Sequence, residues 1–579
     1  MGEIQIKKSS KTYDVVIVGS GAGGGMAAYI LAHAGVKVLL LEAGPYFDPA
    51  KHSSQLKFPY QSPRRGASTR ARDFGDFDAA FGGWQLEGEP YTKKDDTEFD
   101  WFRSRMLGGR TNHWGRISLR FGPKDFQPTD GLSERWPITY DEVKPYYDKI
   151  DRLLGIYGTK EGLENDPDGI FLPPPKPRLP ELFIMKGAAK AGVKVIPGRG
   201  SVLTEALPDN KDRGSCFFCG QCNRSCKVYA DFSASSCLVI PALKTGNLEL
   251  ISNAMAREVL TDKDGLSTGV SYISKDDMQE YQVMAKTVVL AASACESARI
   301  MLNSRSNVHP NGLGNSSGLV GKYLQDSTGA SQSGMLPQLM DRKRYNEDGV
   351  GSIHILGPWM EDNSKLNFPR GYHIEFGGGM GMPGYGFGGG VPKLNGVLPG
   401  RDGKKKEAGG FGASLKDDYR RFYGTQFGMA GRGVGMARVT NYCEIDPNVV
   451  DKFGIPVLRF HYKWDNDEIN QAKHMQETFD RIIHEMGAIP TSTKHGPEDM
   501  WGLEAPGRII HEVGTARMGN DLKKSVLNKW CQAHDCKNLF VVDGAPTVQQ
   551  SDKNATWTIL ALSMRTSEYI LEQSKKQNI

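Results

Sequence analysis

The stretch that decides the fold is residues 11–42, KTYDVVIVGSGAGGGMAAYILAHAGVKVLLLE. Asp14–Val18 is a short apolar and β-branched run, typical of a buried parallel strand. Residues 19–24, GSGAGG, follow it as a G-x-G-x-x-G motif. Met26–Ala34 then has the composition of a helix, and Val36–Leu41 is a second apolar strand. The order of strand, glycine turn, helix and strand predicts one βαβ unit.

The residue types within this unit have a physical explanation. Gly19 allows a tight turn, Gly21 removes the side chain where a pyrophosphate would approach, and Gly24 lets the helix pack closely on the strand. The N-terminus of the helix would offer free N–H groups to the phosphates. Glu42, at the end of the second strand, could accept hydrogen bonds from a ribose. A glycine-rich structural turn is the alternative, but the complete unit favours a bound dinucleotide.

Size and composition restrict the classes of function. The chain has 579 residues, too many for one hydrophobic core, so two or more domains are expected. The 72 Lys and Arg residues against 67 Asp and Glu residues give a net charge of +5, which argues against a nucleic-acid-binding protein. We find no apolar run of about 18 residues and no apolar segment in the polar N-terminus, and therefore expect neither a transmembrane helix nor a secretory signal.

The pattern changes along the chain. Residues 45–98 are rich in Gly, Pro and charge and predict long surface loops. Residues 327–505 alternate short strand-like pieces with turns, as an antiparallel sheet does. Within them, residues 377–390 and 401–406 are expected to be mobile loops.

A cluster of cysteines marks a local site. Cys216, Cys219, Cys222 and Cys226 form C-x2-C-x2-C-x3-C, the spacing of bacterial ferredoxins, although Lys227 replaces the usual proline. Thiolates at this spacing could turn inward around one iron–sulfur cluster, either [3Fe-4S] or [4Fe-4S]. Zinc is the alternative, because four thiolates also suit a tetrahedral ion, but zinc sites are usually split into two separated pairs.

Three segments together with the βαβ unit carry a family resemblance. They are MLGGRTNHW at 106–114, HEVGT at 511–515 and NLFVVDG at 538–544. In this order along the chain they resemble the glucose–methanol–choline (GMC) flavoprotein oxidoreductases. With the cysteine run, the chain resembles the bacterial iron–sulfur sugar dehydrogenases of that family, which comprise the catalytic subunits of fructose, gluconate and glucose dehydrogenase and the glucoside 3-dehydrogenases.

The resemblance implies an α/β (α+β) fold with a Rossmann-like FAD-binding domain and a substrate domain built on an antiparallel sheet. The FAD-binding domain is expected at 1–326 and 506–579, with the iron–sulfur loop at 214–237. The substrate-binding domain is expected at 327–505.

The resemblance also implies that the dinucleotide is FAD. The residues expected to bind it are Gly19, Gly21, Gly24, Glu42, Gly108, Gly109, Asn112, His113, Val259, Asp543, Gly544 and Thr556. His113 stands where pyranose oxidases carry a histidine covalently linked to FAD. Two alternatives stay open here: a covalent link, or a histidine that only packs on or hydrogen-bonds the flavin.

The resemblance implies the catalytic pair as well. His511 matches the family's base, since a neutral imidazole can take the proton of an alcohol. Asn554 matches the second position, where an amide can orient the same hydroxyl. We expect a dehydrogenase that oxidises a secondary alcohol of a sugar, with C3 of a glucoside favoured.

An iron–sulfur cluster would let electrons leave one at a time, so we expect them to pass to a cytochrome or quinone. A small subunit with an export signal and a cytochrome c acceptor are the expected partners, which places the protein in the periplasm or at a membrane; the cytoplasm is the alternative. Two other functions stay open: an oxygen-using enzyme like pyranose oxidase, and an electron-transfer flavoprotein without a substrate of its own.

Overall fold

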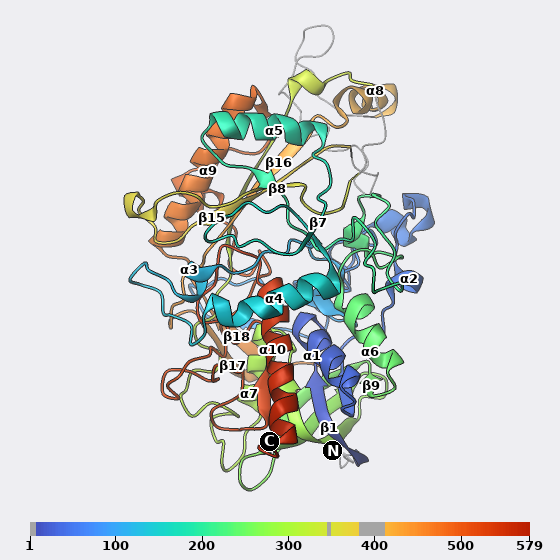
Figure 1. Cartoon of the computed structure of the whole chain (residues 1–579), viewed down its shortest axis with the longest axis vertical. Coiled ribbons are helices and arrows are strands. Elements are labelled where there is room, and N and C mark those ends of the chain that lie inside the picture. The colour runs from blue at the N-terminus through green and yellow to red at the C-terminus, as the bar shows by residue number, and fades with distance from the viewer. Residues whose placement is uncertain (1–6, 344–348, 381–410) are drawn as a thin grey trace.

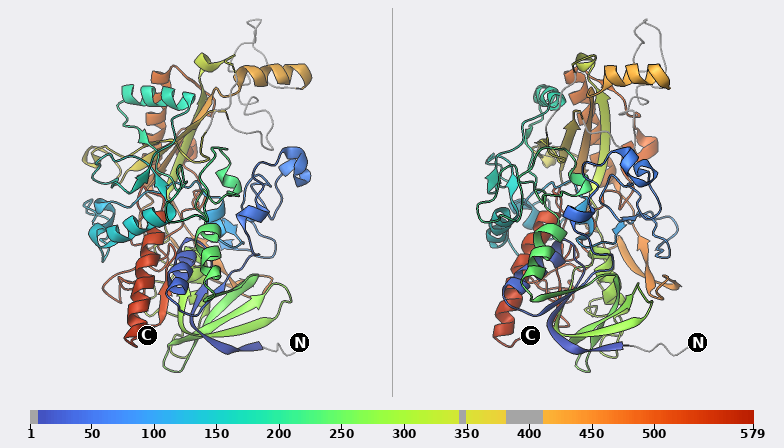
Figure 2. Two further views of the ribbon diagram at one scale, coloured as in Figure 1. Left: turned by 45° about the vertical axis from the view of Figure 1, so that its right-hand side comes forward. Right: turned by 90° about the vertical axis from the view of Figure 1, so that its right-hand side faces the viewer.

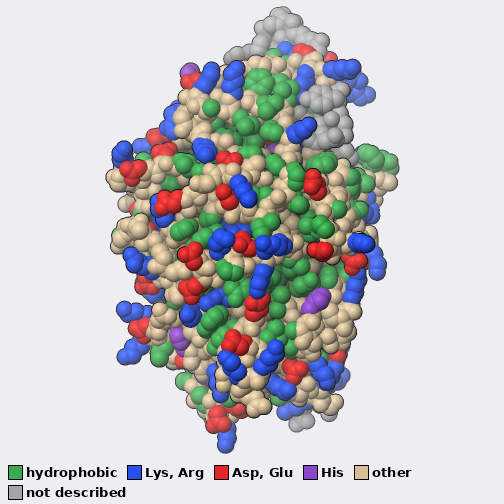
Figure 3. All heavy atoms as spheres, viewed as in Figure 1, with side chains coloured by type: hydrophobic (Ala, Val, Ile, Leu, Met, Phe, Trp, Pro, Cys, Tyr) green, Lys and Arg blue, Asp and Glu red, His purple; other side chains and the backbone are tan. Residues whose placement is uncertain are grey.

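The computed structural model describes residues 7–343, 349–380 and 411–579. The predicted loop at 401–406 and most of that at 377–390 lie outside these residues. Two sheets follow one another along the long axis, and both chain ends lie at the lower end of the molecule (Figures 1 and 2). On the face in Figure 3, basic and acidic side chains are interspersed. No helix among the described residues is long and apolar enough to cross a membrane.

The lower sheet has seven strands and contains the predicted βαβ unit. Its strands are β1 (Lys7–Val18), β2 (Val38–Leu41), β9 (Leu248–Ile251), β10 (Ala254–Thr261), β11 (Ser267–Ser274), β12 (Glu280–Leu290) and β20 (Leu539–Val541). The strand β1 pairs in parallel with β2 and β12, and β2 pairs in parallel with β9. All four residues of β2 are buried, as expected for a parallel strand covered on both faces. The Rossmann-like part of the predicted fold is therefore confirmed.

The helix α1 (Ala22–His33) starts earlier than Met26, the predicted start. Glycines follow Ala22 in its first turn, and Gly23 and Gly24 lie directly against backbone atoms. This close packing explains why the helix starts before Met26. A Cβ on Gly24 would stand 1.9 Å from the carbonyl oxygen of Gly19. Because no side chain intervenes, the first turn of the helix can be formed directly after the strand, with its N-terminus at the turn.

The upper sheet has six strands in the order β19-β13-β16-β15-β14-β8. They are β8 (Ile196–Pro197), β13 (Thr328–Met335), β14 (Ile355–Gly357), β15 (Tyr372–Gly378), β16 (Gln426–Gly433) and β19 (Ile489–Pro490). Every pairing is antiparallel, which confirms the predicted second sheet. Its edge strand β8 comes from outside 327–505, so residues of the predicted FAD-binding segment extend this sheet; the domain boundaries themselves stay a prediction.

The described residues also form three smaller sheets. The strands are β17 (Tyr442–Val450) and β18 (Pro456–His461) with β4 (Thr92–Lys93), β3 (Gly82–Gly83) with β5 (Arg103–Ser104), and β6 (Ile156–Tyr157) with β7 (Phe171–Leu172). The segment predicted as surface loops at 45–98 therefore contributes β3, β4 and several buried side chains, such as Phe77 and Ala80.

Helices cover both sheets. They are α2 (Pro49–His52), α3 (Pro123–Phe126), α4 (Tyr140–Leu154), α5 (Leu179–Lys190), α6 (Ile240–Lys244), α7 (Ala294–Asn303), α8 (Gly412–Phe422), α9 (Asn466–Met486) and α10 (Thr556–Lys575). The helix α10 packs on α1 and α4, and α9 packs on α5 and on β13 (Figure 1). The predicted capping box at α4 is present, since Thr139 N donates to Glu142 Oε2 at 2.9 Å and Glu142 N donates to Thr139 Oγ1 at 3.4 Å.

Candidate active site

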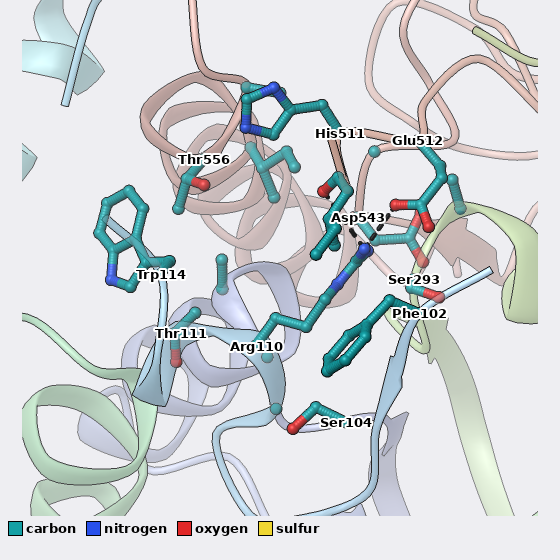
Figure 4. A pocket seen from close by; sticks show the side chains of 18 of the residues that line it. Phe102, Ser104, Arg110, Thr111, Trp114, Ser293, His511, Glu512, Asp543 and Thr556 are labelled. Carbon is teal, nitrogen blue, oxygen red and sulfur yellow. Dashed lines mark hydrogen bonds and ion pairs between the residues drawn. The ribbon is translucent and has the colours of Figure 1, made fainter. Parts of the chain in front are cut away.

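A cavity of about 480 Å³ lies between the two sheets. Six of the segments that line it are 19–23, 102–105, 291–294, 509–513, 543–544 and 554–556. Figure 4 shows the side chain of Arg110 extending across it toward Glu512. Segments from near both ends of the chain thus meet at this cavity, although about 500 residues separate the glycine turn from residues 543–544.

The glycine turn fits a bound pyrophosphate. Gly19 has φ +94°, a left-handed conformation that favours glycine. A Cβ on Gly21 would have no heavy atom within 4 Å. Because Gly21 has no side chain, its backbone faces the cavity directly. Gly21 is also the N-cap of α1 and has no side chain to bond the first N–H groups, which leaves them free for an anion. These residues have the shape and the donors that the phosphates of a dinucleotide require.

Glu42 lies where β2 ends and lines the same cavity. Its carboxylate accepts hydrogen bonds from Ser20 N at 3.2 Å and from Gly44 N at 2.8 Å. Burial raises the pKa of Glu42, while these bonds oppose that change. The acid is held beside the glycine turn, as a ribose-binding residue would be.

His511 and Asn554 face each other at one end of the cavity. His511 Nε2 lies 3.3 Å from Asn554 Nδ2, and His511 Nδ1 lies 3.0 Å from Ser327 Oγ. Asn554 precedes α10 by two residues, and His511 is fixed through its backbone N–H, which donates to Asp326 Oδ1 at 2.9 Å. Asn554 Nδ2 also donates to Glu375 Oε1 at 3.5 Å, and a carboxylate can only accept. The amide nitrogen therefore faces both groups, so His511 accepts at Nε2 and carries its proton on Nδ1.

Burial lowers the pKa of His511 to about 3, and Arg432, His373 and Arg110 act in the same direction while Glu375 opposes them. The imidazole is consequently neutral near pH 7, with a lone pair on Nε2. Asn554 Oδ1 is buried and has no hydrogen-bond partner among the residues that the structure describes. This end of the cavity thus presents one basic nitrogen and one unpaired acceptor.

The sequence analysis missed three polar side chains behind this pair. His373 and Glu375 lie two residues apart on β15, and Arg432 lies on the neighbouring strand β16. His373 Nε2 is 3.2 Å from Glu375 Oε1, and Arg432 Nε is 3.6 Å from Glu375 Oε2. Burial alone would raise the pKa of Glu375, but Arg432, His373 and His511 together lower it to about 2. The signal in the sequence was the spacing His-x-Glu in an otherwise apolar strand, which places both side chains on one face.

Arg110, which is partly exposed, forms an ion pair with the buried Glu512 in the cavity (Figure 4). Asp326, below His511, accepts hydrogen bonds from the backbone N–H groups of His511 and Gly507 at 2.9 and 2.8 Å. Burial, and then the charge of Glu512, raises the pKa of Asp326 to about 7. This carboxyl group therefore fixes the backbone that carries the basic nitrogen.

Most of the residues predicted to bind FAD line the cavity. Those that do are Gly19, Gly21, Glu42, Gly109, His113, Asp543, Gly544 and Thr556, whereas Gly24, Gly108, Asn112 and Val259 do not.

Two of the others support the wall. Gly108 N donates to Ser20 Oγ at 2.8 Å, and Asn112 Nδ2 donates to the carbonyl oxygen of Leu107 at 2.8 Å. Val259 lies in β10, where its N–H donates to Ser304 Oγ at 2.8 Å.

His113 lies in an aromatic and apolar part of the cavity wall. Its ring centroid is 5.5 Å from that of Phe102 and 6.0 Å from that of Phe74. Nδ1 faces Asp78 Oδ1 at 3.7 Å, and the buried Nε2 has no hydrogen-bond partner within the described residues. Burial lowers the pKa of His113 to about 3. A neutral ring with one unpaired nitrogen is compatible with both alternatives, the covalent link and the packing role.

The four clustered cysteines are free thiols on one loop. Cys216 packs in one apolar cluster with Cys222 and in another with Cys226. Gln55 Nε2 lies 3.2 Å from Cys219 Sγ and 3.8 Å from Cys226 Sγ. Over the described part of the chain, no three His, Cys, Asp or Glu side chains converge as one metal ion requires.

Comparison with known proteins gives consistent results over nearly the whole chain. A family model described as GMC oxidoreductase matches residues 14–328, and a second with that description matches residues 439–563.

Among curated proteins, the chain is 28% identical to 2-methyl-1,2-propanediol dehydrogenase of Mycolicibacterium austroafricanum, covering 97% of this chain and 96% of that protein. It is 26% identical to the fructose dehydrogenase large subunit of Gluconobacter japonicus, covering 97% and 98%. Among solved structures, formate oxidase of Aspergillus oryzae superposes with a TM-score of 0.65 at 15% identity, covering 99% of each chain, which supports the fold alone.

Proposed function

The chain belongs to the GMC oxidoreductase family and is an FAD-dependent enzyme that oxidises an alcohol, and we propose that this alcohol is a secondary hydroxyl of a sugar or glycoside. The observation that carries the proposal is the meeting of His511 and Asn554 in the cavity bounded by the glycine turn. When bound, FAD supplies the acceptor for the hydride. The remaining chemistry belongs to the side chains of this chain.

In this proposal, the substrate hydroxyl replaces the amide of Asn554 as the partner of His511 Nε2, and His511 takes its proton there. Its neutral state near pH 7 makes the lone pair available, and the bond between Nδ1 and Ser327 Oγ keeps the correct tautomer. The carboxylate of Glu375 faces the pair through Asn554 Nδ2 and remains ionised. It is therefore placed to stabilise the positive charge that His511 acquires with the proton.

Asn554 orients the substrate. Its unpaired Oδ1 can accept a hydrogen bond from a second hydroxyl group, so a polyol can donate one proton to Asn554 while it offers another to His511. A simple alcohol would leave this acceptor unpaired. This supports a substrate with two or more hydroxyl groups, the class to which sugars belong, and we propose C3 of a glucoside as the position oxidised.

We further propose that the cysteine loop holds an iron–sulfur cluster bound by Cys216, Cys219, Cys222 and Cys226, which would supply a one-electron acceptor. This proposal is supported by the short separation between the cavity wall and the cysteine loop. Asp78 lines the cavity beside His113, and its neighbour Ala79 donates from N to the carbonyl oxygen of Asn223 at 2.8 Å. Asn223 follows Cys222 directly, so one hydrogen-bonded layer separates the cavity wall from the cysteine loop.

The partners and the location are proposals that rest on the relatives. The relative from Gluconobacter japonicus is named a large subunit, which supports association of this chain with a smaller subunit. A cytochrome c is proposed as the electron acceptor. In that arrangement the small subunit would carry the export signal, and the enzyme would work in the periplasm or at a membrane.

The test of the sugar proposal is an anaerobic screen in which flavin absorbance near 450 nm is followed with a panel of sugars, glycosides and short diols. Bleaching by glycosides but not by diols is expected. Bleaching by no member of the panel would support an electron-transfer flavoprotein instead. Re-oxidation with air and with an artificial one-electron acceptor is then compared. Rapid turnover with air alone would favour an oxidase, as in the second function considered.

A further inference from the structure

A second cavity, of about 720 Å³, lies beside α3, whose residues Lys124 and Asp125 line it. Four segments contribute to it: 124–130, 163–166, 359–371 and 552–553. None of its lining residues also lines the first cavity. Its deep end nevertheless lies close to the active site, because Asp552 and Lys553 immediately precede Asn554.

The lining of the second cavity is acidic. The acids are Asp125, Asp130, Glu164, Asp166, Glu361, Asp362 and Asp552, and the bases are Lys124, Arg370 and Lys553. Three positive charges against seven negative ones leave a formal charge of −4. A cavity with this balance favours a cationic ligand.

The three bases already have acidic partners within the lining. Arg370 binds Asp125 at 2.8 Å, and Lys553 binds Asp552 at 2.7 Å. Lys124 binds Glu164 at 2.7 Å near the rim. These pairs leave other carboxylates of the cavity without a positive partner from the lining.

Asp166 is the carboxylate that indicates a ligand. The residue is only 5% exposed and lines the cavity, and within the described residues its side chain has no hydrogen-bond or ion-pair partner, although Lys553 and Arg199 lie near enough to act on its charge. Asp552 Oδ2 is buried and similarly lacks a hydrogen-bond partner there. Burial raises the pKa of Asp166 to about 6, and Asp552 adds to that effect while Lys553 opposes it. An unpaired buried carboxylate costs free energy, which a donor in the cavity would recover.

The geometry does not suit a bare metal ion, because no three acidic, histidine or cysteine side chains of the described residues converge on one point. The donors must therefore be spread over a molecule. Trp359 offers an aromatic surface on the same wall and is held by a bond from its Nε1 to Asn363 Oδ1 at 3.0 Å. Aromatic surface and scattered carboxylates suit a ring with C–H faces, hydroxyl groups and an ammonium group.

We propose that this cavity is a second binding site, distinct from the site of alcohol oxidation, for an amino sugar or a similar polyhydroxylated ammonium compound whose charged nitrogen binds Asp166. The site does not depend on the proposed substrate of the first cavity. It is connected to the active site through His373, whose Nδ1 hydrogen-bonds the carbonyl oxygen of Asp552 and whose Nε2 faces Glu375 at 3.2 Å. Two contacts through His373 therefore join Asp552, in the lining of the second cavity, to the carboxylate that faces His511 and Asn554.

The experiment is isothermal titration of the oxidised holoenzyme with glucosamine, and with N-acetylglucosamine as the ligand that keeps the ring but lacks the charge. Glucosamine should bind at least about tenfold more tightly, the difference expected for one charge-assisted hydrogen bond. Equal affinities would overturn the proposal, as would displacement of glucosamine by an equimolar amount of calcium.

Asp166→Asn should weaken glucosamine binding by about tenfold, since it removes the charge but keeps the shape. Asp362→Asn is the matched control, because it removes one charge from an exposed position of the same cavity and should change the affinity less than about twofold. If glucosamine bound only in the first cavity, Asp166→Asn would bind it like the wild type and the proposal would be wrong. Should Asp166→Asn not fold, Ser364→Trp, at an exposed position of the lining, should block the site, and unchanged binding would again contradict it.

Discussion

His511 Nε2 and Asn554 Nδ2 lie 3.3 Å apart, although 43 residues separate them in the chain. Both side chains line the cavity that begins at the glycine turn. The amide hydrogen of Asn554 and the carboxylate of Glu375 fix which nitrogen of the imidazole carries the proton. In the proposed reaction the pair divides two tasks, proton acceptance by His511 and orientation of the alcohol by Asn554.

This division predicts unequal losses on substitution. Removing a general base typically slows the reaction by roughly 10² to 10⁴, so His511→Ala should slow flavin reduction by that factor. Asn554→Ala should cost less, because it removes a positioning hydrogen bond and leaves the base. The measurement is anaerobic stopped-flow reduction by substrate. Re-oxidation of chemically reduced flavin by an acceptor is the control and should stay near wild type, while reduction of His511→Ala at the wild-type rate would exclude His511 as the base.

The low pKa of His511 predicts the pH dependence of flavin reduction. The imidazole is the active form when neutral, and a pKa of about 3 keeps it neutral at every pH well above 3. The rate should therefore stay level from about pH 9 to pH 5 and fall only as the pH approaches 3, whereas an ordinary histidine would lose half its activity near pH 6.5. A break near pH 7 that disappears in Asp326→Asn would belong to Asp326, whose pKa is raised to about 7. A break near 6.5 that persists in this variant would contradict the prediction.

Substitutions at Gly21 and Gly24 should have different effects, one on flavin binding and the other on stability. In Gly21→Val the new side chain meets no atom of the protein within 4 Å at Cβ, so the chain should fold but lose its flavin. In Gly24→Ala the Cβ would stand 1.9 Å from the carbonyl oxygen of Gly19, and the fold itself should be destabilised by roughly 1–3 kcal/mol or more. Thermal unfolding and the ratio of absorbance at 450 and 280 nm measure both effects. Full flavin retention in Gly21→Val would contradict the assignment of the turn.

The role of His113 can be decided by acid precipitation. If the histidine is linked covalently to FAD, the precipitated protein stays yellow and His113→Ala releases the colour. Release of the flavin from the wild type would leave only the packing role against Phe102 and Phe74.

The cysteine loop should contain iron. We expect a brown protein with roughly three or four irons per chain, and a Cys219→Ser variant with less iron but unchanged flavin reduction by substrate. Elemental analysis and the absorbance of the dithionite-reduced protein test this. Cys443→Ser is the matched control, because Cys443 is a buried free thiol outside the loop and should leave the iron content unchanged. Zinc in place of iron would make the cluster assignment wrong.

Local sequence determined the first part of the fold. Asp14–Val18 and Val36–Leu41 could be recognised as strands because a parallel strand is buried on both faces and must be apolar throughout. The capping box at Thr139 and the antiparallel character of residues 327–505 depend on similarly short-range rules. The start of α1 was misjudged, because the close approach of Gly24 to Gly19 is a contact across the turn that propensity does not describe.

The chemical groups of the candidate site, including the glycine turn, the pair of His511 and Asn554 and the four clustered cysteines, could be located from the sequence alone, because motif spacing is a property of the chain. Only the tertiary structure decided what surrounds them. Glu375 and Arg432 belong to the second sheet, and no local signal tells that its strands turn these charges toward His511. Burial is likewise a property of the folded molecule, so the low pKa of His511 and the unpaired carboxylate of Asp166 exist only once distant segments exclude water from them.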